Sequence, residues 1–241
     1  MKTRPLYALK RPLDIVLSSL VLLFLSPLLL IVAFFVRLSL GAPIFYPQNR
    51  TGLHGRKIFL YKFRTMTNAR NARGDLLCDA DRITALGRFL RKWSLDELPG
   101  LWNVLKGDLS LVGPRPLLIR YLNRYSPEQA RRLEVVPGIT GWAQVNGRNA
   151  VDWERKLSMD VWYVDHWSLG LDFKIILMTI WKVLSREDVL EEGGGTFPEF
   201  WGTQSPPPGG PLAYPVDQDE ELVIEDQNKA RGNPWMKEVS P

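Results

Sequence analysis

The 22 residues IVLSSLVLLFLSPLLLIVAFFV, Ile15–Val36, contain no charged side chain and carry the strongest structural signal in the chain. A membrane-spanning helix needs about 20 mainly apolar residues, so the run is long enough to cross a bilayer. It is too long for the apolar part of a cleaved signal peptide, and no small-residue cleavage site follows it. By length alone, the simplest interpretation is a single-pass anchor.

Two features favour a re-entrant hairpin over a spanning anchor. Ser26-Pro27 lies in the middle of the run, where proline removes a backbone donor and clashes with the preceding turn. Basic residues flank the run on both sides, with Lys10 and Arg11 before it and Arg37 after it. Because positive flanks prefer the cytoplasmic side, a helix–break–helix hairpin that enters and leaves by one face satisfies both. Each arm of about 11 residues would reach roughly 16 Å, too short to cross the hydrocarbon.

The remainder of the sequence predicts a mainly α fold with short β elements, an α+β class. One short strand is predicted over residues 58–63. Helices are predicted over residues 81–92, 127–133, 152–165 and 172–184. The first of these helices is basic and amphipathic, a pattern typical of interfacial helices on anionic membranes. We therefore expect a re-entrant membrane hairpin with interfacial amphipathic helices and a small cytoplasmic catalytic domain, divided as residues 1–40 (hairpin), 41–192 (catalytic domain) and 193–241 (tail).

Charge and composition separate the tail from the rest of the chain. The formal net charge is +5, but the residues from Gly193 onward carry −5, which leaves +10 on the preceding part. The tail also holds 8 of the 18 prolines and 7 of the 19 glycines, so it is expected to be disordered. One cysteine and two histidines argue against a disulfide framework or a structural zinc site. The basic body predicts an anionic partner.

The stretch Ser94-Leu95-Asp96-Glu97-Leu98-Pro99 is the candidate for chemistry. Its local pattern favours a helix start, with Ser94 and Glu97 at capping-box spacing or Asp96 as the N-cap. The two adjacent carboxylates nevertheless stand in a strongly basic body, and Arg115 follows between two prolines that stiffen the backbone. A preorganised arginine suits bidentate phosphate binding, and carboxylates suit Mg²⁺ or nucleophilic attack on phosphorus. The pattern therefore indicates phosphoryl chemistry beside a membrane surface.

A series of ordered motifs resembles the bacterial sugar transferases, the small monotopic phosphoglycosyl transferases. The resemblance covers about residues 7–190 and is highly specific because the motifs occur in order. The matching segments are Lys10–Asp14, the apolar run with Ser26-Pro27, Lys62–Met66, Arg82–Thr84, Gly87–Arg91, Asp96–Pro99, Leu101–Pro116 and Pro137–Arg148.

The resemblance implies an activity and a role for each site residue. Members transfer a sugar-1-phosphate from a UDP-sugar to polyprenyl (undecaprenyl) phosphate and release UMP. By this resemblance Asp96 is the nucleophile of a ping-pong reaction that passes through a phosphosugar-aspartate. Glu97, with Asp96, would hold Mg²⁺, and Arg91 and Arg115 would contact substrate phosphates.

The same resemblance implies a location and partners. It places the chain at the bacterial inner (cytoplasmic) membrane, with the catalytic domain on the cytoplasmic face. Ser26 and Pro27 would break the hairpin, while Lys10 and Arg11 would lie at the lipid headgroups. The implied partners are membrane lipids and downstream glycosyltransferases of surface-polysaccharide assembly, including exopolysaccharide and lipopolysaccharide, and no nucleic acid. The sugar, the pathway and a homo-oligomeric state stay open.

Two alternatives stay open beside this interpretation. Asp79-Ala80-Asp81 matches the DxD pattern of glycosyltransferases that move only the sugar and release UDP, although the pattern is short and frequent by chance. A membrane-anchored basic module that binds nucleic acid or anionic lipid would show no turnover and a steep salt dependence. Phosphosugar transfer is preferred because the ordered motifs favour it.

Overall fold

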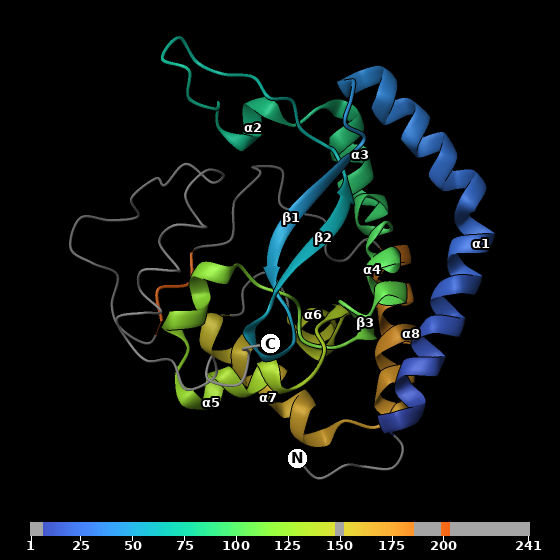
Figure 1. Cartoon of the computed structure of the whole chain (residues 1–241), viewed down its shortest axis with the longest axis vertical. Coiled ribbons are helices and arrows are strands. Elements are labelled where there is room, and N and C mark those ends of the chain that lie inside the picture. Colours follow the sequence, from blue (N-terminus) through green and yellow to red (C-terminus); the bar gives the residue numbers. More distant parts are fainter. Residues whose placement is uncertain (1–6, 148–151, 186–198, 203–241) are drawn as a thin grey trace, which may run out of the picture.

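The computed structural model describes residues 7–147, 152–185 and 199–202. The predicted class is confirmed, because these residues form mainly helices with short strands (Figure 1). In chain order the elements are α1 (Tyr7–Leu40), β1 (Phe45–Thr51), η1 (Leu53–Gly55), β2 (Lys57–Phe63), α2 (Asp79–Arg82), α3 (Ala85–Lys92), η2 (Leu95–Glu97), α4 (Gly100–Lys106), β3 (Ser110–Val112), η3 (Ile119–Arg124), α5 (Pro127–Ala130), η4 (Arg131–Glu134), β4 (Gly138–Thr140), α6 (Trp142–Asn146), α7 (Trp153–His166) and α8 (Leu169–Ser185), where η marks a 3-10 helix.

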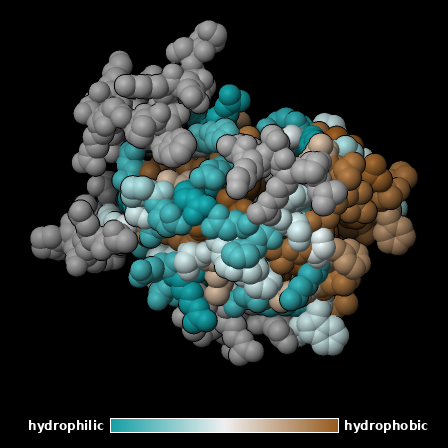
Figure 2. All heavy atoms as spheres, turned by 90° about the horizontal axis from the view of Figure 1, so that it is seen from below, coloured by the Kyte–Doolittle hydropathy of each residue, from teal (hydrophilic) through white to brown (hydrophobic). Residues whose placement is uncertain are grey.

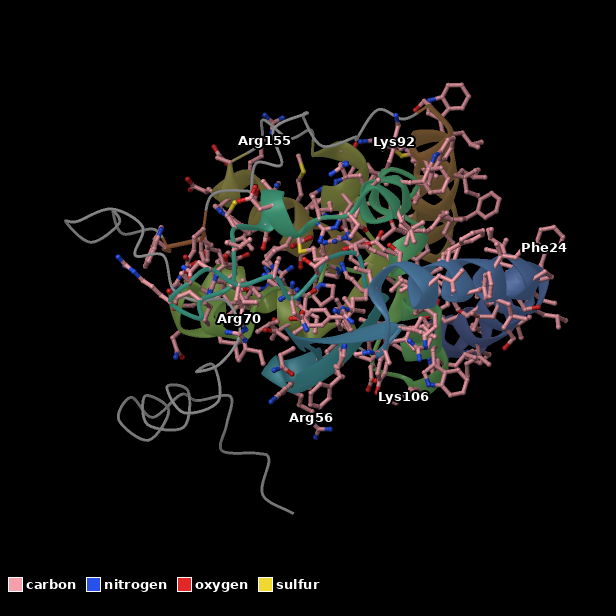
Figure 3. The ribbon with its side chains drawn as sticks, turned by 90° about the horizontal axis from the view of Figure 1, so that it is seen from above. Phe24, Arg56, Arg70, Lys92, Lys106 and Arg155 are labelled. Carbon is pink, nitrogen blue, oxygen red and sulfur yellow. The ribbon has the colours of Figure 1, made fainter. Side chains whose placement is uncertain are left out.

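Helix α1 runs along one side of the molecule and is curved in Figure 1. Its 34 residues extend over roughly 50 Å at 1.5 Å per residue. Among the described residues it is the one helix long and apolar enough to cross a membrane. Phe24, near its middle, is 84% exposed and points away from the body in Figure 3. In water these apolar side chains of α1 would be exposed to solvent, so the helix is suited to an apolar environment such as a membrane.

Helix α1 does not break at Pro27, because it remains helical through Ser26-Pro27, although its course is curved in Figure 1. The re-entrant hairpin stays a prediction. Proline removes the N–H that would otherwise donate to the carbonyl of Leu23, four residues earlier. In the structure the Ser26 Oγ donates to this Leu23 carbonyl at 2.8 Å. The serine thus satisfies the group that proline leaves unpaired, and the segment can stay helical.

Both ends of α1 are fastened to the rest of the chain. Lys10, expected at the headgroups, is instead buried, and its Nζ lies 2.5 Å from Asp172 Oδ2 in α8. Arg11, also expected there, donates to the carbonyls of Val104 and Leu105, at 2.8 Å for the latter. These carbonyls lie in the last turn of α4, where a cation complements the helix dipole and fills unpaired acceptors. Sequence position alone does not reveal that these two residues face inward.

The C-terminal half of α1 packs into a hydrophobic cluster with Val32 and Val36 against Phe63 of β2 and Leu90 of α3. Its end is held by Arg64, whose Nη1 donates to the Leu40 carbonyl at 3.2 Å. Helix α1 therefore contacts the domain near both ends, while its middle presents apolar side chains outward.

Two small sheets organise the domain. β1 and β2 form an antiparallel hairpin, with Phe45 opposite Phe63, and this confirms the predicted strand. β3 and β4 pair in parallel, with Ser110 opposite Gly138. The main hydrophobic cluster lies where β3 meets α6, α7 and α8, and its buried members are Val112, Val145, Tyr163, Trp167 and Ile175.

The predicted helix over residues 81–92 is divided in the structure. Helix α2 ends at Arg82, and the chain is extended at Ile83 and Thr84 before α3 begins. Thr84 is the N-cap of α3, since its Oγ1 accepts from the Gly87 amide at 2.9 Å. A threonine that caps a new helix start explains why the periodic apolar pattern overstates the length of this helix.

One side of the molecule is dominated by apolar side chains, seen as the brown region of Figure 2. Helices α1 and α8 supply most of the exposed large hydrophobic residues, and α3 and α4 add one aromatic residue each. In these three helices outside α1, the exposed large hydrophobic residues are Phe89 in α3, Trp102 in α4, and Phe173, Leu177, Ile180, Trp181 and Leu184 in α8. An apolar surface of this kind marks a membrane or protein interaction site in a folded protein.

The segment Glu199–Gly202 packs against the domain, although it falls in the predicted tail. Phe200 is 2% exposed and lies among Tyr121, Tyr125 and Trp153, with ring centroids 5.3 to 5.7 Å away. Arg124 donates to Glu199 Oε1 at 2.8 Å and stacks over the Trp201 ring at 4.6 Å. These four residues therefore belong to the folded unit. The rest of the predicted tail lies outside the described residues.

Phe200→Ala is expected to lower the free energy of unfolding by roughly 3 kcal/mol, because it empties a buried aromatic site. The midpoint of thermal unfolding in detergent measures this loss. Deletion of residues 203–241 retains Phe200 and serves as the matched control, while deletion of residues 199–241 removes it. Equal midpoints for the two deletions would show that Phe200 adds nothing to the stability of the domain.

Candidate functional site

The two carboxylates predicted for chemistry lie on a tight turn between α3 and α4. Helix α3 ends at Lys92, Ser94 then adopts a left-handed conformation (φ 52°), and η2 carries Asp96 and Glu97. The predicted capping roles are wrong, since neither Ser94 nor Asp96 caps α4, which begins after Pro99 without a side-chain cap. Figure 1 shows α3 and α4 following one another along the inner side of α1.

Glu97 is the centre of an ion-pair network. Its Oε1 accepts from Lys62 Nζ at 2.6 Å and from Arg115 Nη2 at 2.7 Å. Arg115 Nη1 lies 3.4 Å from the second oxygen, Oε2, so the arginine approaches with both terminal nitrogens. The network joins β2, η2 and the segment after β3, which are far apart in the sequence.

The pKa values of the two neighbouring carboxylates are shifted in opposite directions. Burial raises the pKa of Asp96, which is 8% exposed, and the negative charge of Glu97 raises it further. Lys62 and Arg91 lower the pKa of Asp96 only in part. Burial would also raise the pKa of Glu97, but Arg115 and then Lys62 outweigh it, and the pKa falls well below the ordinary value. Glu97 is thus held as an anion at neutral pH, whereas burial and the charge of Glu97 disfavour the ionised form of Asp96.

Arg91, predicted to contact phosphate, is oriented by Thr65. Its Nε donates to Thr65 Oγ1 at 3.1 Å, and Thr65 is buried. Helix α3 approaches this residue closely at Gly87, where an added Cβ would lie 2.0 Å from the Thr65 carbonyl oxygen. Only glycine allows this approach, so Gly87 helps to set the position of Arg91 relative to Asp96.

Two further residues shape the site, and neither was assigned a role from the sequence. Lys62 is paired with Glu97 and lowers the pKa of Asp96. Its place in the matching segment Lys62–Met66 was the sequence feature that could have pointed to it. Asn103 is fully buried in α4 and anchors β2, because its side chain accepts from the Tyr61 amide at 3.0 Å and donates to the Phe59 carbonyl at 2.7 Å. These bonds fix the strand that carries Lys62.

Positive charge gathers around the two carboxylates. Lys62, Arg91 and Arg115 act on them directly. The pKa of Lys156 in α7 is lowered by burial and then by the positive charge of Arg115, so this lysine adds to the same region. Three cations against Asp96 and Glu97 leave an excess positive charge, which suits a bound diphosphate.

The donor set is compatible with one hard cation that shares its ligands with a substrate. Mg²⁺ is commonly held by one or two carboxylates together with substrate phosphates, and Asp96 and Glu97 are adjacent carboxylates. Within the described ranges no group of three or more His, Cys, Asp and Glu side chains is placed to hold a metal. The DxD residues therefore do not join this site: Asp79 pairs with Arg82 at 3.5 Å, and Asp81 accepts from Cys78 at 3.0 Å.

Asp96→Asn is expected to raise the stability of the folded protein at neutral pH. The raised pKa of Asp96 means that the folded state binds this proton more tightly than the unfolded chain. Stability from this group is therefore present below its unfolded pKa and is lost as pH rises through the folded pKa. The midpoint of unfolding should be higher for the variant at pH 7, and the difference should shrink as pH falls. A lower midpoint at pH 7 would contradict the unfavourable burial of this carboxylate.

Two adjacent carboxylates held among three cations are an arrangement typical of sites that bind phosphorylated ligands. Comparison with known proteins gives the family. The model of the family described as "Bacterial sugar transferase" matches residues 6–186. The chain belongs to this family, as the resemblance of its ordered motifs predicts.

Individual relatives cover the chain to different extents. It is 54% identical over 195 residues to an uncharacterized sugar transferase EpsL of Bacillus subtilis, covering 81% of this chain and 96% of that protein. It is 42% identical to an undecaprenyl-phosphate galactose phosphotransferase of Salmonella typhimurium, covering 74% of this chain but 41% of that protein. It is 41% identical to a UDP-glucose:undecaprenyl-phosphate glucose-1-phosphate transferase of Escherichia coli, covering 72% and 40% respectively. The relatives whose names state a substrate are thus more than twice as long as the part matched.

Proposed function

We propose that the chain transfers a sugar-1-phosphate from a UDP-sugar to polyprenyl phosphate and releases UMP. The observation that carries this proposal is the contrast between two adjacent carboxylates. Glu97 is tied to Lys62 and Arg115, whereas Asp96 is a buried carboxylate with raised pKa and the cations close by. The names of the Salmonella and Escherichia relatives support the same substrates.

In the first step, an oxygen of Asp96 attacks the phosphorus nearer the sugar. The bond from Asp96 to phosphorus forms as the anhydride bond to the uridylyl phosphate breaks, so UMP leaves with the electron pair. Arg91 and Arg115 neutralise charge on the phosphate oxygens, and their orientation by Thr65 and Glu97 reduces the reorganisation needed at that moment. Burial keeps Asp96 poorly hydrated and thus reactive as a nucleophile.

In the second step, a phosphate oxygen of the polyprenyl phosphate attacks the phosphosugar held on Asp96. The new phosphoanhydride bond forms, the bond to Asp96 breaks, and the free carboxylate returns. Mg²⁺ held by Glu97 and Asp96 would neutralise the diphosphate and the leaving group. Because the two anionic substrates use the site in turn, one cluster of cations serves both.

The apolar surface supports a membrane location for the acceptor. The polyprenyl chain is a hydrocarbon, and the exposed aromatic residues Phe89 in α3 and Trp102 in α4 flank the turn that carries Asp96. We further propose that α1 is re-entrant at the inner membrane, with both its ends and the domain on the cytoplasmic face. The contacts of Lys10 and Val36 with the domain support this topology, since both ends of α1 meet the same body. Membrane lipids and downstream glycosyltransferases are its proposed partners.

Labelling of two introduced cysteines is expected to show one side of the membrane for both flanks of α1. Lys2→Cys and His54→Cys, each in a Cys78→Ser background, should both be shielded from a membrane-impermeant thiol reagent in intact cells. Both should react after the cells are opened, which controls for accessibility. Reaction of only one of them in intact cells would indicate a spanning helix.

The nucleotide product tests the reaction. Detergent-solubilised protein is incubated with Mg²⁺, undecaprenyl phosphate and separate UDP-sugars, and the released nucleotide is identified. UMP that appears only with the lipid phosphate and one sugar is the expected result, and it also names the donor. Release of UDP instead would contradict the proposal and indicate transfer of the sugar alone.

A further inference from the structure

Arg132, in η4, is a buried arginine next to the proposed active site. Its side chain is 2% exposed. Its Nε and Nη2 donate to Asp160 Oδ2 at 3.0 and 2.7 Å, and Nη1 lies 3.3 Å from the Tyr125 hydroxyl. The Nη2 also donates to the backbone carbonyl of Arg115 at 2.6 Å. One guanidinium thus joins a buried carboxylate, a phenol and the main chain of a proposed phosphate-binding residue.

Few other hydrogen-bonding groups are available to fix the backbone around Arg115. Pro114 and Pro116 have no N–H, so the flanking peptides lack the usual donors. The Pro114 carbonyl accepts from the Gly138 amide at 3.0 Å, and the Arg115 carbonyl accepts from Arg132. The carbonyls of both residues are therefore held, the first by β4 and the second by a side chain.

Stability alone is a weak explanation for this arrangement. A buried ion pair often contributes little net stability, because removing both charges from water offsets their attraction. Burial raises the pKa of Asp160, and its Oδ1 is buried without a hydrogen-bond partner among the described residues. The ion pair is therefore costly to bury and only partly hydrogen-bonded, whereas Arg132 Nη2 is shared between Asp160 and the Arg115 carbonyl.

We infer that Arg132 is a positioning residue that sets the backbone of Arg115 and hence the reach of its guanidinium to Glu97 and substrate phosphate. The inference rests on the proposed function for the role of Arg115. Asp160 neutralises Arg132, and Tyr125 braces it through its ring, whose centroid lies 5.7 Å from the guanidinium carbon. Phe200 packs against the ring of Tyr125, with ring centroids 5.7 Å apart, so the segment Glu199–Gly202 supports the residue that braces Arg132.

A double-substitution cycle tests the coupling. Arg132→Lys keeps the positive charge but loses the fork, and it should lower kcat/KM for UMP release by about 10- to 100-fold, as expected for a misplaced catalytic group. In an Arg115→Ala background the same change should have an effect of less than about threefold, because there is no guanidinium left to misplace. A purely structural role would give the same factor in both backgrounds and would overturn the inference.

Arg131→Lys is the matched control for the cycle. Arg131 is the preceding residue, and it pairs at the surface with Glu128 and Asp165 instead of contacting Arg115. Its replacement should change kcat/KM by less than about twofold, the scale of a surface ion pair. Asp160→Asn, which retains an oxygen acceptor for Arg132, is carried through the same cycle in case Arg132→Lys fails to fold, with the same dependence on Arg115 expected.

A second measurement separates this inference from the proposed function, because it needs no turnover. The ¹⁵N–¹H signals of the Arg115 guanidinium, assigned by their loss in Arg115→Ala, report whether the group is held by Glu97. Arg132→Lys or Asp160→Asn should move these signals toward those of a free arginine, while Arg131→Lys should not. Unchanged signals would overturn the inference even if UMP is released. Absence of UMP from every UDP-sugar would instead count against the proposed function alone.

Discussion

Asp96→Asn is expected to lower UMP release by roughly 10⁴-fold or more, as removal of a covalent nucleophile does in other enzymes. The amide keeps the size of the side chain but cannot attack phosphorus as a carboxylate does. The change should be benign for folding, because burial disfavours the charge of Asp96 and its contacts with the described residues include no ion pair, whereas Glu97 has two. Initial rates with the donor identified from the UDP-sugar panel measure the effect.

Stability provides the control for this variant. Asp96→Asn should unfold at a higher temperature than the unmodified protein at pH 7, so lost activity cannot be ascribed to unfolding. Glu128→Gln, in an exposed carboxylate that pairs with Arg131 at 2.7 Å away from the turn, controls for a general effect of removing charge. Activity within tenfold of the unmodified protein for Asp96→Asn would remove Asp96 as the nucleophile.

Glu97→Gln is expected to lower kcat/KM by roughly 10²- to 10³-fold, the usual effect of removing one electrostatic group from an active site. The substitution removes the acceptor of Lys62 and Arg115 and, in the proposed mechanism, a ligand of Mg²⁺. Freed of their partner, the two cations should also act more strongly on Asp96, whose pKa should fall. The acid side of the pH–rate profile should therefore move to lower pH.

The concentration dependence on Mg²⁺ distinguishes the two roles of Glu97. If Glu97 helps to hold the ion, the variant should need at least several times more Mg²⁺ for half-maximal rate. A Mg²⁺ requirement identical to that of the unmodified protein would restrict Glu97 to positioning the cations. An acid limb that moves to higher pH would contradict the electrostatic coupling between Glu97 and Asp96.

Local features of the fold follow well from the sequence. The uncharged run predicts the apolar part of α1, and the residues of the predicted strand over 58–63 lie in β2. The family is confirmed, because ordered motifs are far more specific than composition. Asp96, Glu97, Arg91 and Arg115 are indeed brought close together, although their roles in the reaction stay a proposal.

Features that depend on partners distant in sequence could not be predicted in this way. Lys10 pairs with Asp172, 162 residues later, and nothing in the basic flank indicates that it is buried. Pro27 is a local exception: the sequence suggests a break there, and whether the Ser26 hydroxyl pairs the Leu23 carbonyl depends on the side-chain rotamer. The Pro- and Gly-rich composition after Gly193 predicts disorder and gives no sign that Phe200 is buried, because that burial depends on three aromatic residues elsewhere in the chain. Arg132 stands in a basic stretch that is typical of an exposed surface, and only the folded structure shows that it bonds to the Arg115 carbonyl.

The covalent intermediate is the central claim, and labelling tests it most directly. Protein is mixed with the identified UDP-sugar carrying ³²P in the phosphate next to the sugar, with Mg²⁺ and without lipid, and is then separated from free nucleotide. The proposed mechanism predicts label bound to the protein, none on Asp96→Asn, and its release as a lipid product when undecaprenyl phosphate is added. Unlabelled protein that still forms UMP and labelled lipid product once both substrates are present would contradict the phosphosugar-aspartate and indicate direct transfer.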